Sequence, residues 1–369
     1  MTDNADKFKD IRPYNDDEIH NAIMRVINSD EFMDAIIGFR FSKIERYTGG
    51  LLRPLLRRYF MHKWGGIQNV DDMQQVVVKF MAHMIETTTT SFTYSGLENL
   101  DKSQNYLFIS NHRDIAMDPS FVNWALFKEG FQTLRIAIGD NLLSKPFTSD
   151  IMRMNKSFIV KRSLPKGRAM LKGLQHLSHY ISQSIKDESG IWIAQREGRA
   201  KDGFDKTEPA IIKMLSLAGR SEKKEFSEHI NDLNIVPVAV SYELDACDEE
   251  KAQGLFQQAL LGYYHKSEFE DIQTIVNGIL GKKGAVHVAF GKPLKGEFED
   301  ADSVAAEIDS QIYENYKLHS TNFIAAKADL SLTTRDQQKQ FADRLAKIPS
   351  ELHEGVLKMY ANPLKNQQK

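Results

Sequence analysis

The chain has 369 residues, of which 41% are hydrophobic and 27% charged, and its formal net charge is −2. This composition is typical of a soluble globular protein with one large domain or two smaller ones, and it excludes the disordered and fibrous classes. Because the charge is close to zero, no global basic field exists and we expect no nucleic-acid partner. The single cysteine, Cys247, excludes an intrachain disulfide framework and a cysteine-rich zinc site.

The first ten residues are acidic and polar and lack the apolar core of a secretory signal. No window approaches the roughly 20 apolar residues that a membrane-spanning helix needs. We therefore expect a cytoplasmic protein without a transmembrane helix, which would meet any lipid substrate at the membrane surface.

Apolar residues recur at helical spacing through the first 90 residues and again after about residue 300. The predicted helices lie at 19–27, 32–41, 51–61, 73–85, 168–186, 303–318 and 334–360.

Between these terminal regions, short apolar and β-branched runs alternate with helical patterns. The predicted strands lie at 92–94, 106–110, 134–138, 157–160, 191–194, 235–240 and 286–290. Such alternation predicts an α/β fold with a mostly parallel central sheet flanked by helices. We expect an N-terminal helical region (1–90), an α/β domain (91–295) and a C-terminal helical extension (296–369).

One apolar run, Leu107 to Ser110, leads into a polar turn that contains His112, with Asp114 and Asp118 close behind. An imidazole titrates near neutral pH, and a neighbouring carboxylate fixes its tautomer and stabilises its protonated form. The histidine is therefore a candidate general base. The alternative is a structural turn in which an aspartate caps the helix that Pro119 begins.

Basic residues gather after two of the predicted strands: Arg162 after 157–160, and Arg196, Arg199 and Lys201 after 191–194. Guanidinium groups bind phosphate or carboxylate oxygens in pairs, and Gly198 allows a close backbone approach. Together these residues predict a site for an anionic ligand, although any one of them alone is more typical of a solvated surface charge.

Four segments in this order resemble the conserved blocks of the glycerolipid acyltransferases, the family that includes glycerol-3-phosphate and 1-acylglycerol-3-phosphate acyltransferases. The segments are Asn111 to Pro119, Phe158 to Ser163, Glu197 to Arg199 and Val236 to Val238. The resemblance covers roughly residues 90 to 295 and does not extend to the terminal helical regions.

The resemblance implies an O-acyltransferase that moves a fatty acyl group from acyl-CoA or acyl-carrier protein to a hydroxyl of a glycerol-phosphate-type acceptor, in phospholipid biosynthesis. It implies His112 as general base and Asp118 as its partner, with Asp114 as the fallback, and it implies no cofactor and no metal. Arg113 is a weaker candidate for contact with the donor phosphate or the oxyanion.

The acceptor phosphate would be held by Arg162, Glu197, Gly198, Arg199 and Lys201. The preferred acceptor is 1-acyl-sn-glycerol 3-phosphate, a lysophospholipid. Glycerol 3-phosphate or dihydroxyacetone phosphate is the alternative.

The first block departs from the family pattern because five residues separate His112 from Asp118 where four are usual, and Met117 stands at the expected aspartate position. In the third block, Ala200 stands where many members carry arginine. The rival of another class is therefore a catalytically inactive homologue that binds lipid without turnover.

The segment from Leu51 to Phe60 combines apolar and basic residues at helical spacing. Its apolar positions are Leu52, Leu55, Leu56 and Tyr59, and Arg53, Arg57 and Arg58 lie on other faces. Such a helix is able to lie on an anionic membrane, so we expect peripheral contact with the cytoplasmic face of the membrane. A domain-packing helix is the alternative.

Overall fold

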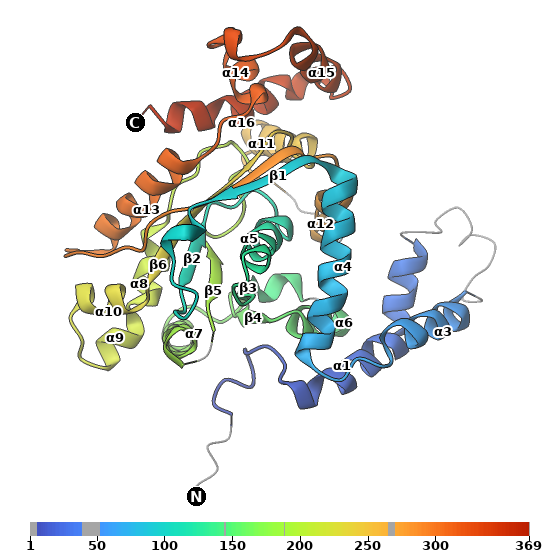
Figure 1. Cartoon of the computed structure of the whole chain (residues 1–369), viewed down its shortest axis with the longest axis vertical. Helices are drawn as coiled ribbons and strands as arrows, with labels where there is room; N and C mark the ends of the chain where they lie inside the picture. The colour runs from blue at the N-terminus through green and yellow to red at the C-terminus, as the bar shows by residue number, and fades with distance from the viewer. Residues whose placement is uncertain (1–5, 39–51, 144, 188, 265–269, 369) are drawn as a thin grey trace, which may run out of the picture. The chain divides into compact units, whose positions relative to one another are not determined.

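The computed structural model describes residues 6–38, 52–143, 145–187, 189–264 and 270–368 (Figure 1). The chain folds as two compact units, each built from two stretches of sequence. The first unit comprises Met1–Phe80 and Arg135–Tyr180, and the second comprises Met81–Leu134 and Ile181–Lys369. Two helices, α4 (Val70–Thr88) and α7 (Arg168–Asp187), begin in residues of the first unit and end in residues of the second.

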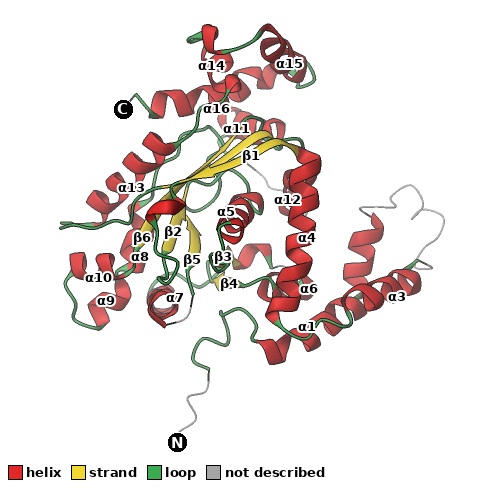
Figure 2. Cartoon of the chain, viewed as in Figure 1, coloured by secondary structure: helices red, strands yellow, loops and turns green. Residues whose placement is uncertain are grey.

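Seven strands form a sheet in the order β1-β7-β6-β2-β5-β3-β4 (Figure 2). They are β1 (Thr89–Ser95), β2 (Leu107–Ser110), β3 (Arg135–Gly139), β4 (Ser157–Val160), β5 (Ile191–Ala194), β6 (Ile235–Tyr242) and β7 (Gly284–Phe290). Neighbours β1 and β7, β2 and β5, β2 and β6, and β3 and β4 are parallel, whereas β6 and β7 are antiparallel. The predicted mixed α/β fold with a mostly parallel sheet and terminal helices is confirmed.

The second unit contains the central strands β2, β5 and β6, whose residues are almost all buried. Strands buried on both faces are near-continuous apolar runs, as these are. In the register, Ser110 at the end of β2 lies beside Ala194 at the end of β5 and beside Val238 in β6. The segments that follow β2 and β5 therefore begin next to each other.

Helices of the second unit surround these strands. They are α5 (Met117–Lys128), α8 (Pro209–Leu215), α9 (Leu217–Ser221), α10 (Phe226–Asp232), α11 (Asp248–Leu261), α12 (Glu270–Leu280), α13 (Ala301–Asn315), α14 (Ser320–Ala326), α15 (Arg335–Leu345) and α16 (His353–Asn366). Short 3₁₀ turns lie at η1 (Leu97–Asn99), η3 (Leu330–Leu332) and η4 (Ser350–Leu352). The helix predicted at 334–360 is two helices, because Pro349 opens the η4 turn between them.

The first unit holds α1 (Asp16–Asn28), α3 (Arg53–Trp64), η2 (Asp140–Leu142) and α6 (Pro146–Met154), besides β3 and β4. Residues 30–38 are also helical, and residues 39–51 of the predicted helical pattern lie outside the described residues. The apolar face of α1 forms a core cluster with Phe32, Met33 and Met154. A capping box between Asn15 and Glu18 begins α1.

Candidate functional site

The turn between β2 and α5 carries the histidine that the sequence singled out. Asn111, which is fully buried, ties the start of this turn to β6: its side-chain amide donates to the Val240 carbonyl at 3.0 Å and accepts from the Val240 N–H at 2.8 Å. This pair of bonds replaces ladder hydrogen bonds that β2 loses where it ends. The backbone that leads into His112 is therefore fixed to the sheet.

His112 and Asp118 are in direct contact. The histidine Nδ1 lies 2.9 Å from the aspartate Oδ2, and the carboxylate is fully buried whereas 13% of the imidazole is exposed. A carboxylate accepts and does not donate, so Nδ1–H is the donor of this bond. The neutral ring then carries its lone pair on Nε2, which is the nitrogen that a general base needs.

Three further donors hold the Asp118 carboxylate. Its Oδ2 accepts from the backbone N–H of Arg113 at 2.6 Å and of Asp114 at 2.9 Å, and its Oδ1 accepts from the Tyr242 hydroxyl at 2.6 Å. The two backbone bonds close the turn around the carboxylate, which explains how the longer interval still brings this aspartate to the ring. Burial, and next the nearby Asp118 charge, raise the pKa of Tyr242 well above its usual value, so its hydroxyl stays a donor.

Asp114 has a different role in the turn. Its Oδ1 accepts from the backbone N–H groups of Ala116 at 3.0 Å and Met117 at 2.9 Å, at the start of α5. Burial first, and then the Asp118 charge, raise the pKa of its carboxyl. The structure therefore gives Asp114 a capping role and brings Asp118, the residue preferred from the Asp-Pro alignment, to the histidine.

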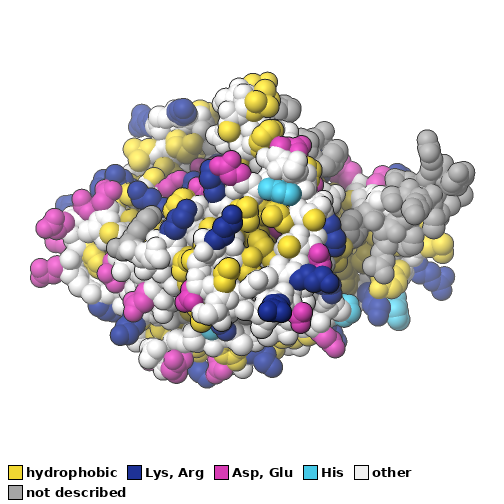
Figure 3. Space-filling view, turned by 90° about the horizontal axis from the view of Figure 1, so that it is seen from above, with side chains coloured by type: hydrophobic (Ala, Val, Ile, Leu, Met, Phe, Trp, Pro, Cys, Tyr) yellow, Lys and Arg dark blue, Asp and Glu magenta, His cyan; other side chains and the backbone are white. Residues whose placement is uncertain are grey.

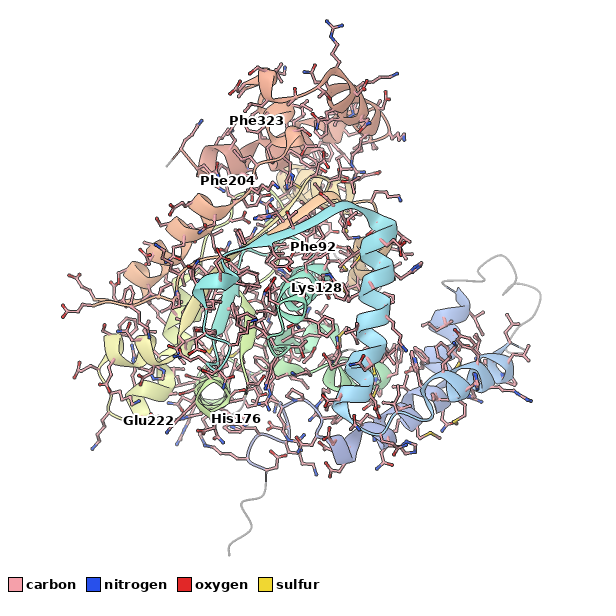
Figure 4. The ribbon with its side chains drawn as sticks, in the orientation of Figure 1. Phe92, Lys128, His176, Phe204, Glu222 and Phe323 are labelled. Atoms are coloured by element: carbon pink, nitrogen blue, oxygen red, sulfur yellow. The ribbon has the colours of Figure 1, made fainter. Side chains whose placement is uncertain are left out.

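Trp192 of β5 packs against His112. The two rings meet edge to face with their centroids 5.8 Å apart, and the indole Nε1–H donates to the Ser110 hydroxyl at 3.0 Å. Nearby, the stacked rings of Phe92 and Phe121, 5.4 Å apart, hold α5 against β1 (Phe92 is labelled in Figure 4). The imidazole thus contacts the Trp192 ring on one side and Asp118 at Nδ1.

The loop after β5 lies directly beside the histidine, because the Ala200 N–H donates to the His112 carbonyl at 2.8 Å. Gly198 has a φ of +73°, a left-handed conformation that glycine adopts without strain. Further along, Gly203 packs on the backbone of α16 at Met359. The next residue, Phe204, is labelled in Figure 4.

Two arginines of this loop keep buried nitrogens without a hydrogen-bond partner among the described residues, namely Nε of Arg196 and Nη1 of Arg199. A terminal nitrogen of Arg196 lies 3.8 Å from the Glu208 carboxylate, a long ion pair. Because unsatisfied buried donors are costly, these nitrogens suit an anion that is brought by a ligand. Lys201 lies over the Tyr264 ring, 4.3 Å from its centroid, and Glu197 is exposed at the start of the loop.

Arg162 belongs to the first unit, where it follows β4. Its backbone N–H donates to the Asp140 carboxylate at 3.1 Å, and its guanidinium packs against Gly139. The predicted anion-binding set is therefore divided, with Glu197, Gly198, Arg199 and Lys201 on one loop of the second unit and Arg162 in the first unit.

Arg113 turns away from its histidine neighbour. It is buried, donates to the Asp205 carboxylate at 2.6 Å and to the Gly203 carbonyl at 3.2 Å, and lies over the Tyr316 ring. This ion pair joins the histidine turn to the following loop. Nη2 of the guanidinium is thus occupied inside the protein, whereas its buried Nε has no hydrogen-bond partner among the described residues.

Sequence reasoning missed Tyr242, Asn111 and Trp192 as parts of the site. The available signal was weak: a tyrosine at the end of a mostly apolar strand needs a partner for its hydroxyl, but the strand sequence does not identify that partner.

In the described residues, no group of three or more His, Cys, Asp and Glu side chains is arranged to hold a metal ion. The site therefore combines a carboxylate-oriented histidine with a loop of partly unsatisfied cations.

Part of the chain is similar to a known family. Residues 91–241 match the family model described as Acyltransferase. No curated protein matches the sequence. Among solved structures, the chain is similar to the crystal structure of the 1-acyl-sn-glycerophosphate (LPA) acyltransferase PlsC from Thermotoga maritima, with 12% sequence identity and a TM-score of 0.39, over 80% of this chain and 91% of that one.

Proposed function

Because residues 91–241 match the Acyltransferase family model, we propose that this protein transfers a fatty acyl group to a hydroxyl of a glycerol-phosphate-type acceptor. The donor is acyl-CoA or acyl-carrier protein, and 1-acyl-sn-glycerol 3-phosphate is the preferred acceptor. Glycerol 3-phosphate or dihydroxyacetone phosphate is the alternative acceptor. The contact between His112 Nδ1 and Asp118 Oδ2, which leaves the lone pair of the neutral ring on Nε2, carries this proposal.

In the proposed reaction, Nε2 of His112 takes the proton of the acceptor hydroxyl while the oxygen attacks the thioester carbonyl. The tetrahedral intermediate collapses with cleavage of the carbon–sulfur bond, and the imidazolium returns its proton to the departing thiolate. Asp118 stabilises the imidazolium between these steps, as the aspartate of a serine-hydrolase triad does. The acceptor hydroxyl takes the place of the serine, so no acyl-enzyme is formed.

The loop after β5 is the proposed site of the acceptor phosphate. The partnerless nitrogens of Arg196 and Arg199 support it, because a phosphate would supply the acceptor oxygens that they lack. Gly198 and Lys201 complete the loop, with Glu197 at its exposed edge. Arg162 is proposed for the same phosphate on the strength of its sequence block alone.

A panel of acceptors with one acyl-CoA and one acyl-carrier protein, read by mass spectrometry, tests the reaction. Wild-type protein is expected to acylate a phosphate-bearing acceptor, and His112→Ala is expected to lower kcat by about a thousandfold, the scale of general-base catalysis with its orienting acid. Full activity of His112→Ala would remove the histidine from the mechanism. A wild-type protein that binds lysophospholipid but acylates no acceptor would instead support the inactive lipid-binding homologue.

Peripheral membrane contact through α3 remains part of the proposal, together with a cytoplasmic location. Leu55, Tyr59 and Met61 are exposed on this helix. However, Arg53 pairs with Asp34 at 2.7 Å and Arg57 pairs with Asp30, so part of the basic charge is neutralised within the protein. In the described residues, no helix is long and apolar enough to cross a membrane. Flotation of the protein with anionic vesicles at low salt tests this contact.

A further inference from the structure

Asp205, in the loop between β5 and α8, contacts the residues on both sides of His112. Its Oδ2 accepts from the Arg113 guanidinium at 2.6 Å and, through a longer bond of 3.4 Å, from the Asn111 side-chain amide. Asn111 directly precedes the histidine in the chain, and Arg113 directly follows it. A single carboxylate oxygen therefore holds both neighbours of the histidine. We call Asn111, Arg113 and Asp205 the histidine clamp.

The histidine clamp is buried. Asn111 is 0% exposed, Arg113 is 5% exposed and Asp205 is 1% exposed. Figure 3 shows other charged side chains at the surface of the molecule, mixed with apolar ones. Solvent and salt screen charges at the surface and screen buried charges much less, so the bond between Arg113 and Asp205 constrains its two partners more strongly than a surface pair does.

The loop that carries Asp205 is bound to two helices near the C-terminus. The Tyr313 hydroxyl of α13 donates to the Asp205 carbonyl. The Asn362 side chain of α16 donates to the Asp202 carbonyl at 2.7 Å. Both helices lie outside residues 91–241, which match the family model. The carboxylate that holds the histidine turn is therefore itself fixed by helices that the family match does not include.

The charges of the histidine clamp are not explained by stability. A buried ion pair contributes little to the free energy of unfolding, because the cost of removing two charges from water offsets most of their attraction. Apolar residues of similar volume would fill the same space at no greater cost. What the charged pair adds is direction, since donors from Asn111 and Arg113 converge on one oxygen atom.

We propose that Asp205 is a positioning residue for His112, and that α13 fixes Asp205 in place. This inference rests on the proposed function, because the residue that is positioned is the general base of that reaction. Among the described residues, the Asp205 carboxylate bonds with Asn111 and Arg113 and not with the imidazole. It therefore acts on the histidine through the backbone of the turn.

The first test replaces the whole ion pair in the full chain, with Arg113→Met and Asp205→Leu combined. Removal of one charge alone would leave the other buried without its partner and endanger folding, whereas removal of both avoids this. The double variant is expected to fold, with kcat for acyl transfer lowered by about ten- to a hundredfold and KM within about twofold of wild type. A misplaced base slows the chemical step and leaves substrate binding unchanged.

The matched control is Arg344→Met combined with Asp248→Leu. Arg344 Nε donates to the buried Asp248 carboxylate at 2.6 Å, so this is a second ion pair of the same kind in the same unit. The control is expected to keep kcat within about twofold of wild type. Equal kcat in the two double variants overturns the inference.

Tyr313→Phe tests the contribution of α13, because it removes the hydroxyl that is bonded to the Asp205 carbonyl and leaves both charges of the ion pair in place. The loss of one hydrogen bond is expected to lower kcat about threefold with KM unchanged. A Tyr313→Phe protein with wild-type kcat overturns the role of α13.

Proton NMR separates this inference from the proposed function, because it needs no substrate. The His112 Nδ1–H, which is bonded to Asp118, gives a low-field resonance that His112→Gln identifies by its loss. The Arg113 and Asp205 double variant is expected to shift this resonance, and the Arg344 and Asp248 control is expected to leave it unchanged. A shift in a protein that acylates no acceptor supports the positioning and overturns only the proposed function. An unshifted resonance overturns the positioning.

Discussion

At the scale of single residues, the Tyr242 hydroxyl decides how firmly the carboxylate beside His112 is held. It donates to Asp118 Oδ1 at 2.6 Å and contacts neither the histidine nor any atom proposed for substrate binding. Tyr242→Phe would leave a buried carboxylate oxygen unsatisfied, a cost of about 1.5 to 3 kcal/mol for a bond to a charged group. We expect kcat to fall by about tenfold while KM stays within about twofold.

Tyr360→Phe is the matched control for this experiment. Tyr360 is also buried, and its hydroxyl donates to the Asp248 carboxylate at 2.9 Å and accepts from the Asp245 N–H at 2.8 Å. Tyr360→Phe is expected to lower the melting temperature at least as much as Tyr242→Phe, but only Tyr242→Phe is expected to lower kcat. Equal kcat in both variants would show that Tyr242 serves stability alone.

The histidine turn also shows how far the sequence predicts a site. His112 and Asp118 are six positions apart in one turn, so their pairing is readable from local pattern and from the Asp-Pro that follows. Tyr242 lies 124 positions from Asp118, and Arg113 lies 92 positions from Asp205. Those contacts depend on the register of β6 and on the path of the loop after β5, which no local pattern specifies. The sequence therefore predicted the pairing of His112 with Asp118 and missed the long-range contacts that hold the turn.

At the scale of elements, α12 is held by a close approach that only glycine permits. Gly278→Ala would drive a methyl group into the Asp114 carboxylate, and because the carboxylate caps α5 it has little room to yield. We expect the free energy of unfolding to fall by about 1 to 3 kcal/mol, the usual cost of overpacking. Thermal denaturation measures it.

Gly66→Ala is the control, since a Cβ there meets nothing within 4 Å. Gly66→Ala is expected to change the free energy of unfolding by less than about 0.5 kcal/mol, as surface substitutions generally do. A Gly278→Ala protein as stable as this control would show that α12 moves without cost.

The elements themselves were largely predictable because apolar runs bounded by polar turns mark buried strands. The predicted strands 157–160 and 191–194 have the bounds of β4 and β5. The prediction of a single helix at 334–360 was wrong because the apolar residues keep helical spacing across the η4 turn. Phe341 before the turn and Val356 after it pack into the same core cluster. Periodicity reports which face is buried and not where a helix bends back on itself.

At the scale of the whole molecule, the half-buried His287 and the buried His319 tie stability to pH. Burial, followed by the Lys317 charge, lowers the pKa of His287 to about 4, and burial also lowers the pKa of His319 to about 4. In the unfolded chain both would titrate near the ordinary value of 6.5. Between pH 6.5 and 4 the unfolded state therefore binds more protons, so the free energy of unfolding falls as the pH falls.

Chemical denaturation at pH 7.5 and pH 5 measures this dependence. His287→Gln is expected to reduce the difference between the two pH values by about 1 kcal/mol, after allowance for the partial exposure of this ring. His62→Gln, at an exposed position of α3, is the control and is expected to leave the difference unchanged. An unaltered difference in His287→Gln would assign the pH dependence to other groups.

The hydrogen bond from the Ala200 N–H to the His112 carbonyl joins the backbone of the proposed base to the loop proposed for the phosphate. Under the proposed function, a phosphate bound by this loop would therefore also restrain the backbone that carries the imidazole. An acceptor that lacks the phosphate is then expected to show a lower kcat as well as a higher KM.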